Sequence, residues 1–113
     1  MRTFEQKMAE KAFERAHSQT SEEYRSFALS FPSLIHTCGL VQAIAFAESK
    51  KMTDYLEDLA EVLKTVEKNL GQNLSKVSRE TGVVEYMRLS RRSLSAASWL
   101  KRYVPPKEGE EGC

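Results

Sequence analysis

Apolar residues return every three or four positions along most of this chain, and that spacing limits its fold more than any other feature. Such spacing places side chains on one side of an α-helix, whereas a strand requires alternation. The clearest run lies between residues 53 and 70, where the apolar positions are Leu56, Leu59, Leu63, Val66 and Leu70. The sequence therefore predicts an all-α protein, a single-domain helical bundle of about five to six helices.

Polar residues with the spacing of helix starts divide the N-terminal part of this pattern. Thr3 and Gln6 have the spacing of a capping box, and so have Thr20 and Glu23. They predict the starts of two helices. Because proline disfavours α geometry in the residue before it, Pro32 predicts the end, or a kink, of the second helix.

The segment after Pro32 is the most apolar in the chain. Proline suits a first helical turn, so we expect a third helix from residue 33 to 49 and expect it to be central. An interior glycine costs about 1 kcal/mol relative to alanine, so Gly39 would mark a close helix crossing. Residues 26–47 carry no charge and could span a bilayer in length, but serine, threonine, histidine, glutamine and proline interrupt them. A buried core helix is favoured.

The C-terminal half contains further helix starts and stops. Thr53 is expected to cap a fourth helix that Gly71 ends. A short helical turn should follow near Leu74. We then expect a short helix and a separate last one, which Ser90 caps and Pro105 stops.

Composition is typical of a small intracellular protein. The chain of 113 residues suffices for one core, which we expect over residues 1–104, followed by a disordered charged tail, 105–113. Cys38 and Cys113 lack the spacing of metal ligands or of a disulfide framework. The N-terminus lacks the apolar stretch of a secretory signal. These features favour a reducing compartment, and we expect a cytoplasmic protein that is not in a membrane.

No residue pattern predicts catalysis. The chain has no glycine-rich phosphate loop, no nucleophile elbow and no paired cysteines. His17 is expected at the end of the first helix, and His36 lies close to Cys38. Residues two apart point to different sides of a helix, so we expect a core cysteine and a partly buried histidine rather than a nucleophile pair. We expect no enzymatic activity and no cofactor.

Four acidic residues lie on one side of the expected fourth helix: Asp54, Glu57, Asp58 and Glu61. They could approach a divalent metal. Metal sites in helical bundles, however, draw ligands from several facing helices, and no other helix offers a matching set. We therefore expect no metal, and a face that meets solvent or a basic partner surface.

The net charge of +1 hides a separation of charge along the chain. Residues 53–70 carry two basic and five acidic residues (2 − 5 = −3), and residues 71–104 carry seven and two (7 − 2 = +5). On a helical wheel Arg91, Ser95, Ser98 and Arg102 fall within about 60° of one another. Two guanidinium groups with hydroxyls between them suit a phosphate backbone. The alternative is a solubilising face with a few ion pairs.

A DNA-reading helix-turn-helix is an alternative interpretation, since residues 74–82 could form its first helix and turn. The second helix of that motif needs apolar anchors where this chain has Arg88 and Arg91. A stand-alone helical adaptor between proteins is a further alternative.

Several blocks together resemble one family. They are residues 31–35 (FPSLI), 39–46 (GLVQAIAF), 85–90 (EYMRLS) and 99–103 (WLKRY). Their order and spacing resemble those of the small subunit of the type III-B CRISPR effector, the Cmr complex, which is the fifth Cmr protein family. The resemblance extends from Tyr24 to Val104.

The resemblance implies a non-catalytic subunit of an antiviral RNA-guided complex. Copies would stack into a minor filament beside the backbone subunits, with the large subunit, the guide RNA and the target RNA as further partners. The candidates for phosphate contacts are then Lys50, Arg88, Arg91, Arg92, Lys101 and Arg102. The acidic helix would meet a basic surface on a neighbouring copy or on the backbone subunit. The residues expected in the core are Gly39, Leu40, Phe46, Trp99 and Leu100.

Overall fold

Six α-helices and no strand account for the apolar periodicity in the computed structural model, which describes residues 3–67 and 74–105. The helices are α1 (Phe4–Ala16), α2 (Glu22–Cys38), α3 (Leu40–Ser49), α4 (Thr53–Lys64), α5 (Leu74–Glu80) and α6 (Val83–Tyr103). The all-α prediction is thus confirmed. Gly71 and the charged tail beyond Pro105 lie outside the described residues.

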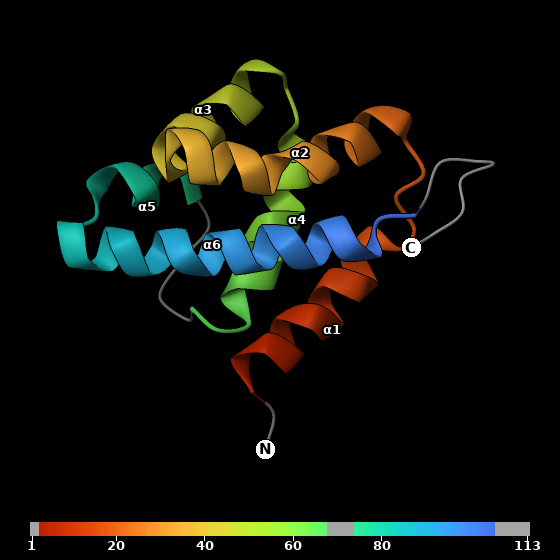
Figure 1. Cartoon of the computed structure of the whole chain (residues 1–113), viewed down its shortest axis with the longest axis horizontal. Helices are drawn as coiled ribbons and strands as arrows, with labels where there is room; N and C mark the ends of the chain where they lie inside the picture. Colours follow the sequence, from red (N-terminus) through yellow and green to blue (C-terminus); the bar gives the residue numbers. More distant parts are fainter. Residues whose placement is uncertain (1–2, 68–73, 106–113) are drawn as a thin grey trace.

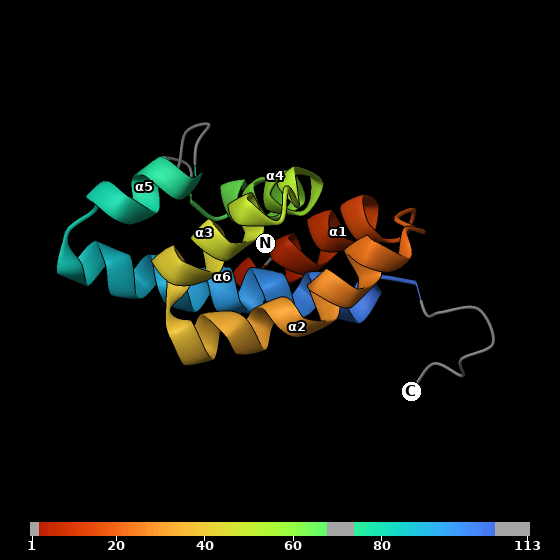
Figure 2. The same cartoon turned by 90° about the horizontal axis from the view of Figure 1, so that it is seen from above.

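Helix α6 runs along the middle of the molecule and organises the fold (Figure 1). It packs against α1, α2 and α4, and α1 also packs against α4. The short helices α3 and α5 contact each other near the N-terminal end of α6, as the view from above shows (Figure 2). Residues from the two ends of the chain therefore share one core.

The buried side of α6 is one uninterrupted stripe: Leu89, Ser93, Ala96, Ala97 and Leu100. Small residues at its centre let neighbouring helices approach closely. Because the stripe continues through Ser90 without a change of phase, no helix boundary forms there. The prediction that Ser90 caps a separate last helix is wrong.

The break between α2 and α3 lies at Gly39, not at Pro32. Pro32 is inside α2, and Phe27, Phe31 and Ile35 on one side of that helix are buried. Ending the helix at the proline would separate these side chains, so their packing outweighs the lost backbone hydrogen bond. Gly39 has φ +89°, a conformation that L side chains rarely adopt, so glycine permits the turn.

Tyr86 of α6 stabilises this turn. Its hydroxyl accepts a hydrogen bond from the Val41 backbone N–H at 3.2 Å, in the first turn of α3. A Cβ on Gly39 would lie 3.6 Å from the same oxygen, which is ordinary contact. The tyrosine hydroxyl therefore acts as the N-terminal capping acceptor of α3, which Gly39 lacks because it has no side chain.

Helix α3 is peripheral, so its predicted central place is wrong. Leu40, Ala43, Ile44 and Ala47 are buried on one side, but Phe46 is 43% exposed. The continuous apolar run had suggested burial all round. Much of the surface of a folded protein is apolar, however, so a continuous apolar run does not require burial on every side.

Helix starts follow the predictions only in part. Thr3 and Gln6 form the predicted capping box, with hydrogen bonds of 3.1 and 2.8 Å. Ser21, not Thr20, caps α2, because its hydroxyl accepts from the Tyr24 N–H. Helix α4 starts after buried Met52 without a side-chain cap, so Thr53 lies inside the first turn. The helix ends at Lys64, earlier than predicted.

Candidate nucleic-acid interface

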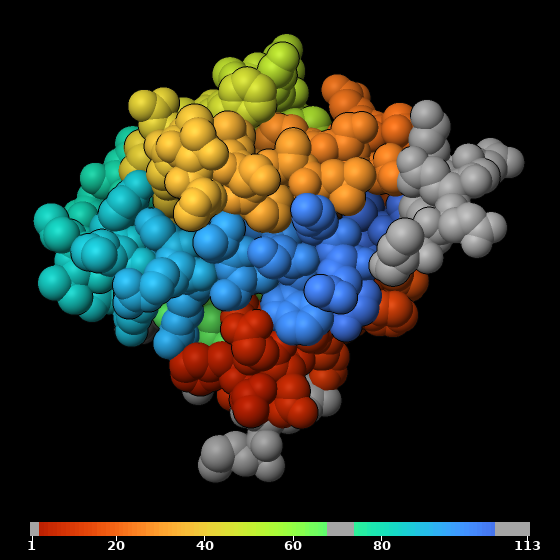
Figure 3. Space-filling model, in the orientation of Figure 1, coloured from red at the N-terminus to blue at the C-terminus, as the bar shows by residue number. Residues whose placement is uncertain are grey.

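The solvent side of α6 carries the polar face that the helical wheel predicted. Arg91, Ser98 and Arg102 are exposed and Ser95 is half-buried, whereas Ala96, Ala97 and Leu100 on the other side are fully buried. We call Arg91, Ser95, Ser98 and Arg102 the α6 face. Helix α6 occupies the middle of the surface seen in Figure 3, between α2 and α1. The face is therefore open to a large partner.

Three of the six predicted phosphate ligands are available on α6. Arg91, Lys101 and Arg102 are exposed. Among the residues that the structure describes, none of the three forms an ion pair. The Arg102 guanidinium carbon lies 5.9 Å from the centre of the Trp99 ring, within cation–π range. Their charges are thus not neutralised within the described part of the chain.

Arg88 and Arg92 are held by an acidic partner. Glu67 pairs with Arg92 at 2.9 Å and with Arg88 at 3.2 Å, and its side chain is only 12% exposed. Arg92 also donates to the Val66 carbonyl at 3.2 Å and lies over the Phe4 ring. Arg92 therefore joins α6 to the N-terminal end of α1 and to the turn after α4.

Lys50 lies away from α6, at the C-terminal end of α3. Its ammonium nitrogen is 5.5 Å from the centre of the exposed Phe46 ring, and that ring stacks on Phe27 of α2. The six predicted basic residues therefore do not form one patch. Only Arg91, Lys101 and Arg102 combine exposure, proximity on α6 and freedom from ion pairs within the described ranges.

A pocket of about 360 Å³ lies at the C-terminal half of the α6 face. Its lining residues are Glu5, Leu94, Ser95, Ser98, Trp99 and Arg102. Trp99 was expected in the core, but it is only half-buried, and its indole N–H donates to the Glu5 carboxylate at 2.7 Å. The sequence prediction missed Glu5 as a site residue, because its contact with Trp99 spans the length of the domain.

Aromatic rings continue from this pocket onto α1. Trp99 stacks on Tyr103 with centroids 5.8 Å apart, and Tyr103 meets the edge of Phe13 at 5.5 Å. Phe13 in turn stacks on His17 at 4.7 Å. The spacing of four residues within each of the pairs Trp99–Tyr103 and Phe13–His17 was the available sequence signal.

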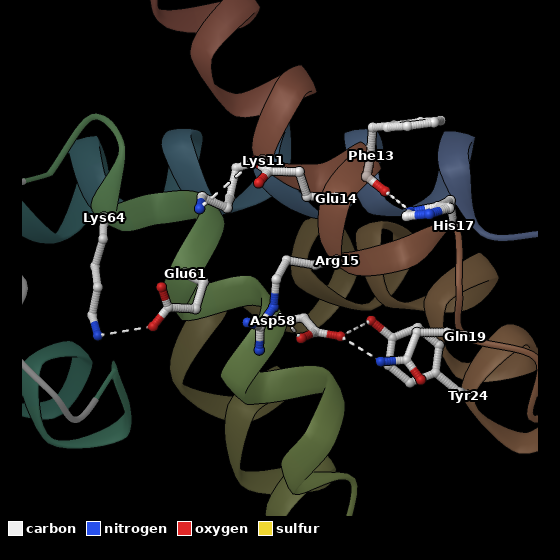
Figure 4. Close-up of polar contacts among 10 residues, drawn as sticks. All are labelled: Lys11, Phe13, Glu14, Arg15, His17, Gln19, Tyr24, Asp58, Glu61 and Lys64. Atoms are coloured by element: carbon white, nitrogen blue, oxygen red, sulfur yellow. Dashed lines mark hydrogen bonds and ion pairs between the residues drawn. The ribbon is translucent and has the colours of Figure 1, made fainter.

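The acidic side of α4 differs from the prediction at one residue. Asp58 is only 2% exposed and accepts three hydrogen bonds: from Arg15 Nε at 2.8 Å, from Gln19 Nε2 at 3.1 Å and from the Tyr24 hydroxyl at 2.5 Å (Figure 4). We call these four residues the Asp58 cluster. Its members come from α1, the α1–α2 connection, α2 and α4. Asp58 therefore stabilises the fold and is not a solvated surface acid.

Burial in this region raises the pKa of two tyrosines. Burial, and then the hydrogen bond to Asp58, raises the pKa of Tyr24. Burial, followed by the charge on Asp58, raises the pKa of Tyr55. The hydrogen bond to Asp58 raises the pKa of Arg15 above an already high value. Both tyrosines therefore stay neutral where ordinary tyrosines ionise.

The other acidic residues of α4 remain accessible. Asp54 and Glu57 are exposed, and Glu61 is half-buried with Lys64 at 3.3 Å. Within residues 3–67 and 74–105, no three histidine, cysteine or acidic side chains approach one another closely enough to hold a metal ion. The face available to a basic partner is therefore smaller than predicted.

The two histidines and Cys38 lie at helix ends. His17 caps the C-terminus of α1, as predicted, and its Nδ1 is 2.6 Å from the Phe13 carbonyl. Cys38 and His36 are both exposed, so the expected burial of this pair is wrong. They occupy the last turn of α2, directly before the turn at Gly39. Among the described helices, none is both long and apolar enough to cross a membrane.

Comparison with known proteins gives consistent matches. The sequence pattern of the family described as CRISPR-associated protein (Cas_Cmr5) matches residues 4–105. A protein of Thermus thermophilus named CRISPR system Cmr subunit Cmr5 is 38% identical over 111 residues, covering 92% of this chain and 95% of its own. The crystal structure of a CRISPR-associated Cmr5 family protein from the same organism aligns with a TM-score of 0.78 at 38% identity, over 90% of this chain and 95% of that one.

Proposed function

The chain belongs to the CRISPR-associated Cmr5 family, and from this premise we propose that it is the non-catalytic small subunit of a cytoplasmic, type III-B Cmr effector complex. In this role it contacts the backbone of guide or target RNA during antiviral RNA targeting. It contributes no catalytic group, and nucleotide sequence is read by base pairing between guide and target. Its protein partners are the backbone subunit, the large subunit and further copies of itself.

The observation that carries the RNA contact is the set of unpaired cations on α6. Arg91, Lys101 and Arg102 are exposed without ion pairs among the described residues, and the Ser95 hydroxyl lies between the arginines, as does that of Ser98, which donates to the Leu94 carbonyl. Guanidinium groups bind phosphate oxygens in a bidentate manner, and hydroxyl groups donate to them. Such contacts fix position without reading sequence.

Repetition of the subunit makes a small number of charges sufficient. Three cations on one copy give weak, salt-sensitive binding. Copies stacked in a filament align these cations along one RNA strand. Because the contacts are then linked, the affinity of the assembly for RNA greatly exceeds that of one copy. The exposed Asp54 and Glu57 support a contact between α4 and a basic surface of a neighbouring subunit.

Two observations disfavour the helix-turn-helix alternative. Arg88 and Arg91 are exposed where that motif needs apolar anchors. In addition, α6 has 21 residues and packs along most of its length against α1, α2 and α4, so it is not a short recognition helix.

The test replaces both arginines of the α6 face with acid. We expect the assembled complex containing Arg91→Glu/Arg102→Glu to bind target RNA more weakly, with little dependence on RNA sequence and with a smaller slope of log affinity against log salt. The control is Lys51→Glu/Arg79→Glu, which changes the charge equally at two exposed residues outside α6 that form no ion pair among the described residues. If the mutant subunit is incorporated normally and both variants bind RNA like the wild type, the α6 face is only a solubilising surface.

A further inference from the structure

We propose that the pocket at the C-terminal half of α6 binds one unpaired RNA nucleotide, with its base against Trp99 and its phosphate at Arg102. The proposal rests on the proposed function, since it specifies how RNA meets the α6 face. It goes further in assigning a base-binding site to a surface so far described only by its charge. The pocket volume of about 360 Å³ lies in the usual range of small-ligand sites.

The aromatic rings supply the surface that a base requires. Trp99 lines the pocket, and Tyr103, Phe13 and His17 continue the row of rings across α6 and α1. Phe13 is 51% exposed although it is a large apolar side chain. Unpaired bases stack on such rings with little regard to sequence, because every base has a π face.

The cation beside the ring supplies the second half of the site. Arg102 is exposed, lies 5.9 Å from the centre of the Trp99 ring and lines the same pocket. A nucleotide that stacks on the indole would bring its phosphate within reach of this guanidinium. The Ser95 hydroxyl also lines the pocket and can donate to a phosphate or sugar oxygen.

The Glu5 carboxylate favours binding of an unpaired nucleotide over binding of a duplex backbone. One oxygen of its carboxylate accepts from Trp99, which orients the indole, and an acid at the rim repels a row of phosphates. The Watson–Crick edge of an unpaired base carries N–H donors that a carboxylate can accept. In a duplex those donors are already paired. The pocket thus combines an acid for the base edge, a ring for its face and a cation for its phosphate.

The chain itself offers a direct probe, because Trp99 is its only tryptophan. Titration of the full chain with a short single-stranded RNA should quench or shift tryptophan fluorescence at low salt. A duplex of the same sequence, and inorganic polyphosphate without bases, should leave the emission unchanged even where they bind.

Substitution tests the same site by affinity. We expect Trp99→Leu to weaken single-stranded RNA binding about tenfold and Trp99→Phe to retain most of it, since stacking on one ring is lost in the first and kept in the second. The matched control is Phe46→Leu, which removes another exposed aromatic ring with a cation beside it, that of Lys50. Circular dichroism verifies that each variant is folded.

The outcomes separate this proposal from the proposed function. Salt-sensitive RNA binding that needs Arg91 and Arg102 but leaves the emission of Trp99 unchanged would overturn the nucleotide site and leave the backbone contact intact. Equal quenching by polyphosphate, or no RNA binding by the isolated chain, would also overturn it. Loss of Trp99→Leu from the assembled complex, with RNA binding of the free chain unchanged, would identify the surface as a protein interface instead.

Discussion

The acidic side of α4 and the basic side of α6 look alike in sequence, but they behave differently in the folded chain. Each is a set of like charges at helical spacing. On α4, Asp58 is turned inward and accepts three hydrogen bonds from other parts of the chain. On α6, Arg91 and Arg102 face solvent without an ion pair among the described residues.

The difference shows what decides whether a charged helix face is structural. Asp58 meets side chains that lie 34 to 43 residues earlier in the chain, and those partners compensate its burial. Arg88 and Arg92 meet Glu67 in a similar way, whereas Arg91 has no such partner in the described chain. The partner, rather than the spacing, separates a structural charge from one that is available for binding.

Removal of the buried acid should have the largest effect on stability. We expect Asp58→Ala to lower the free energy of unfolding by about 3 kcal/mol, because it leaves Tyr24 and Arg15 without their shared acceptor. Chemical denaturation gives the measurement. The control is Glu57→Ala, one residue earlier and exposed, which should change stability by less than about 0.5 kcal/mol. Equal effects of the two variants would show that Asp58 is no more structural than its neighbour.

Removal of the charge on Glu67 should lower stability less than Asp58→Ala does, and it should also change RNA binding. We expect Glu67→Gln to destabilise the fold by about 2 kcal/mol, since the ion pairs with Arg88 and Arg92 lose their charge. The same change frees Arg92 from its ion pair beside the α6 face, whereas Arg88 stays paired with Glu85, so binding to single-stranded RNA should strengthen. Denaturation and RNA titration measure the two effects. Unchanged RNA affinity would place Arg92 outside the binding surface.

A buried hydroxyl beside the Asp58 cluster should be dispensable. The Tyr55 hydroxyl is buried without a hydrogen-bond partner among the described residues. We therefore expect Tyr55→Phe to stabilise the fold by about 1 kcal/mol. Tyrosine ionises near pH 10 in the unfolded chain, but its pKa is raised in the folded chain, so stability falls as the pH rises above about 10. The phenylalanine variant should lose less stability there, and denaturation at pH 8 and above pH 10 provides the check.

Reversal of charge on α6 should affect stability least. Arg91→Glu/Arg102→Glu is expected to change the free energy of unfolding by no more than about 0.5 kcal/mol per site, because both side chains are exposed. A loss as large as that of Asp58→Ala would remove the distinction between the two faces. The thermal unfolding midpoint of the free subunit is a sufficient measurement.

Local signals in the sequence predicted the features that depend on neighbouring residues. The Thr3–Gln6 capping box and the polar face of α6 need only helical spacing, and both predictions were confirmed. The start of α2 was predicted at Thr20, but Ser21, one residue later, caps the helix. The Tyr24 N–H donates to the Ser21 hydroxyl, and the Tyr24 hydroxyl donates to the distant Asp58, a contact that local spacing does not indicate.

Features that depend on distant packing could not be predicted in this way. Pro32 carries a stronger local stop signal than Gly39, yet packing of Phe31 and Ile35 keeps α2 continuous through the proline. The burial of Asp58 and the pocket around Trp99 likewise depend on Arg15 and Glu5 in α1. A single sequence does not show which segments of the chain meet.

The bond between Glu5 and Trp99 joins residues 94 positions apart, and this closure affects how a growing chain can fold. Helix α1 leaves the ribosome before α6, but the surface that covers Met8 and Ala12 includes α6. Until α6 emerges, α1 lacks its main packing partner. The domain is therefore expected to fold as one cooperative unit only after α6 has emerged, and more slowly than a helical bundle with mostly local contacts.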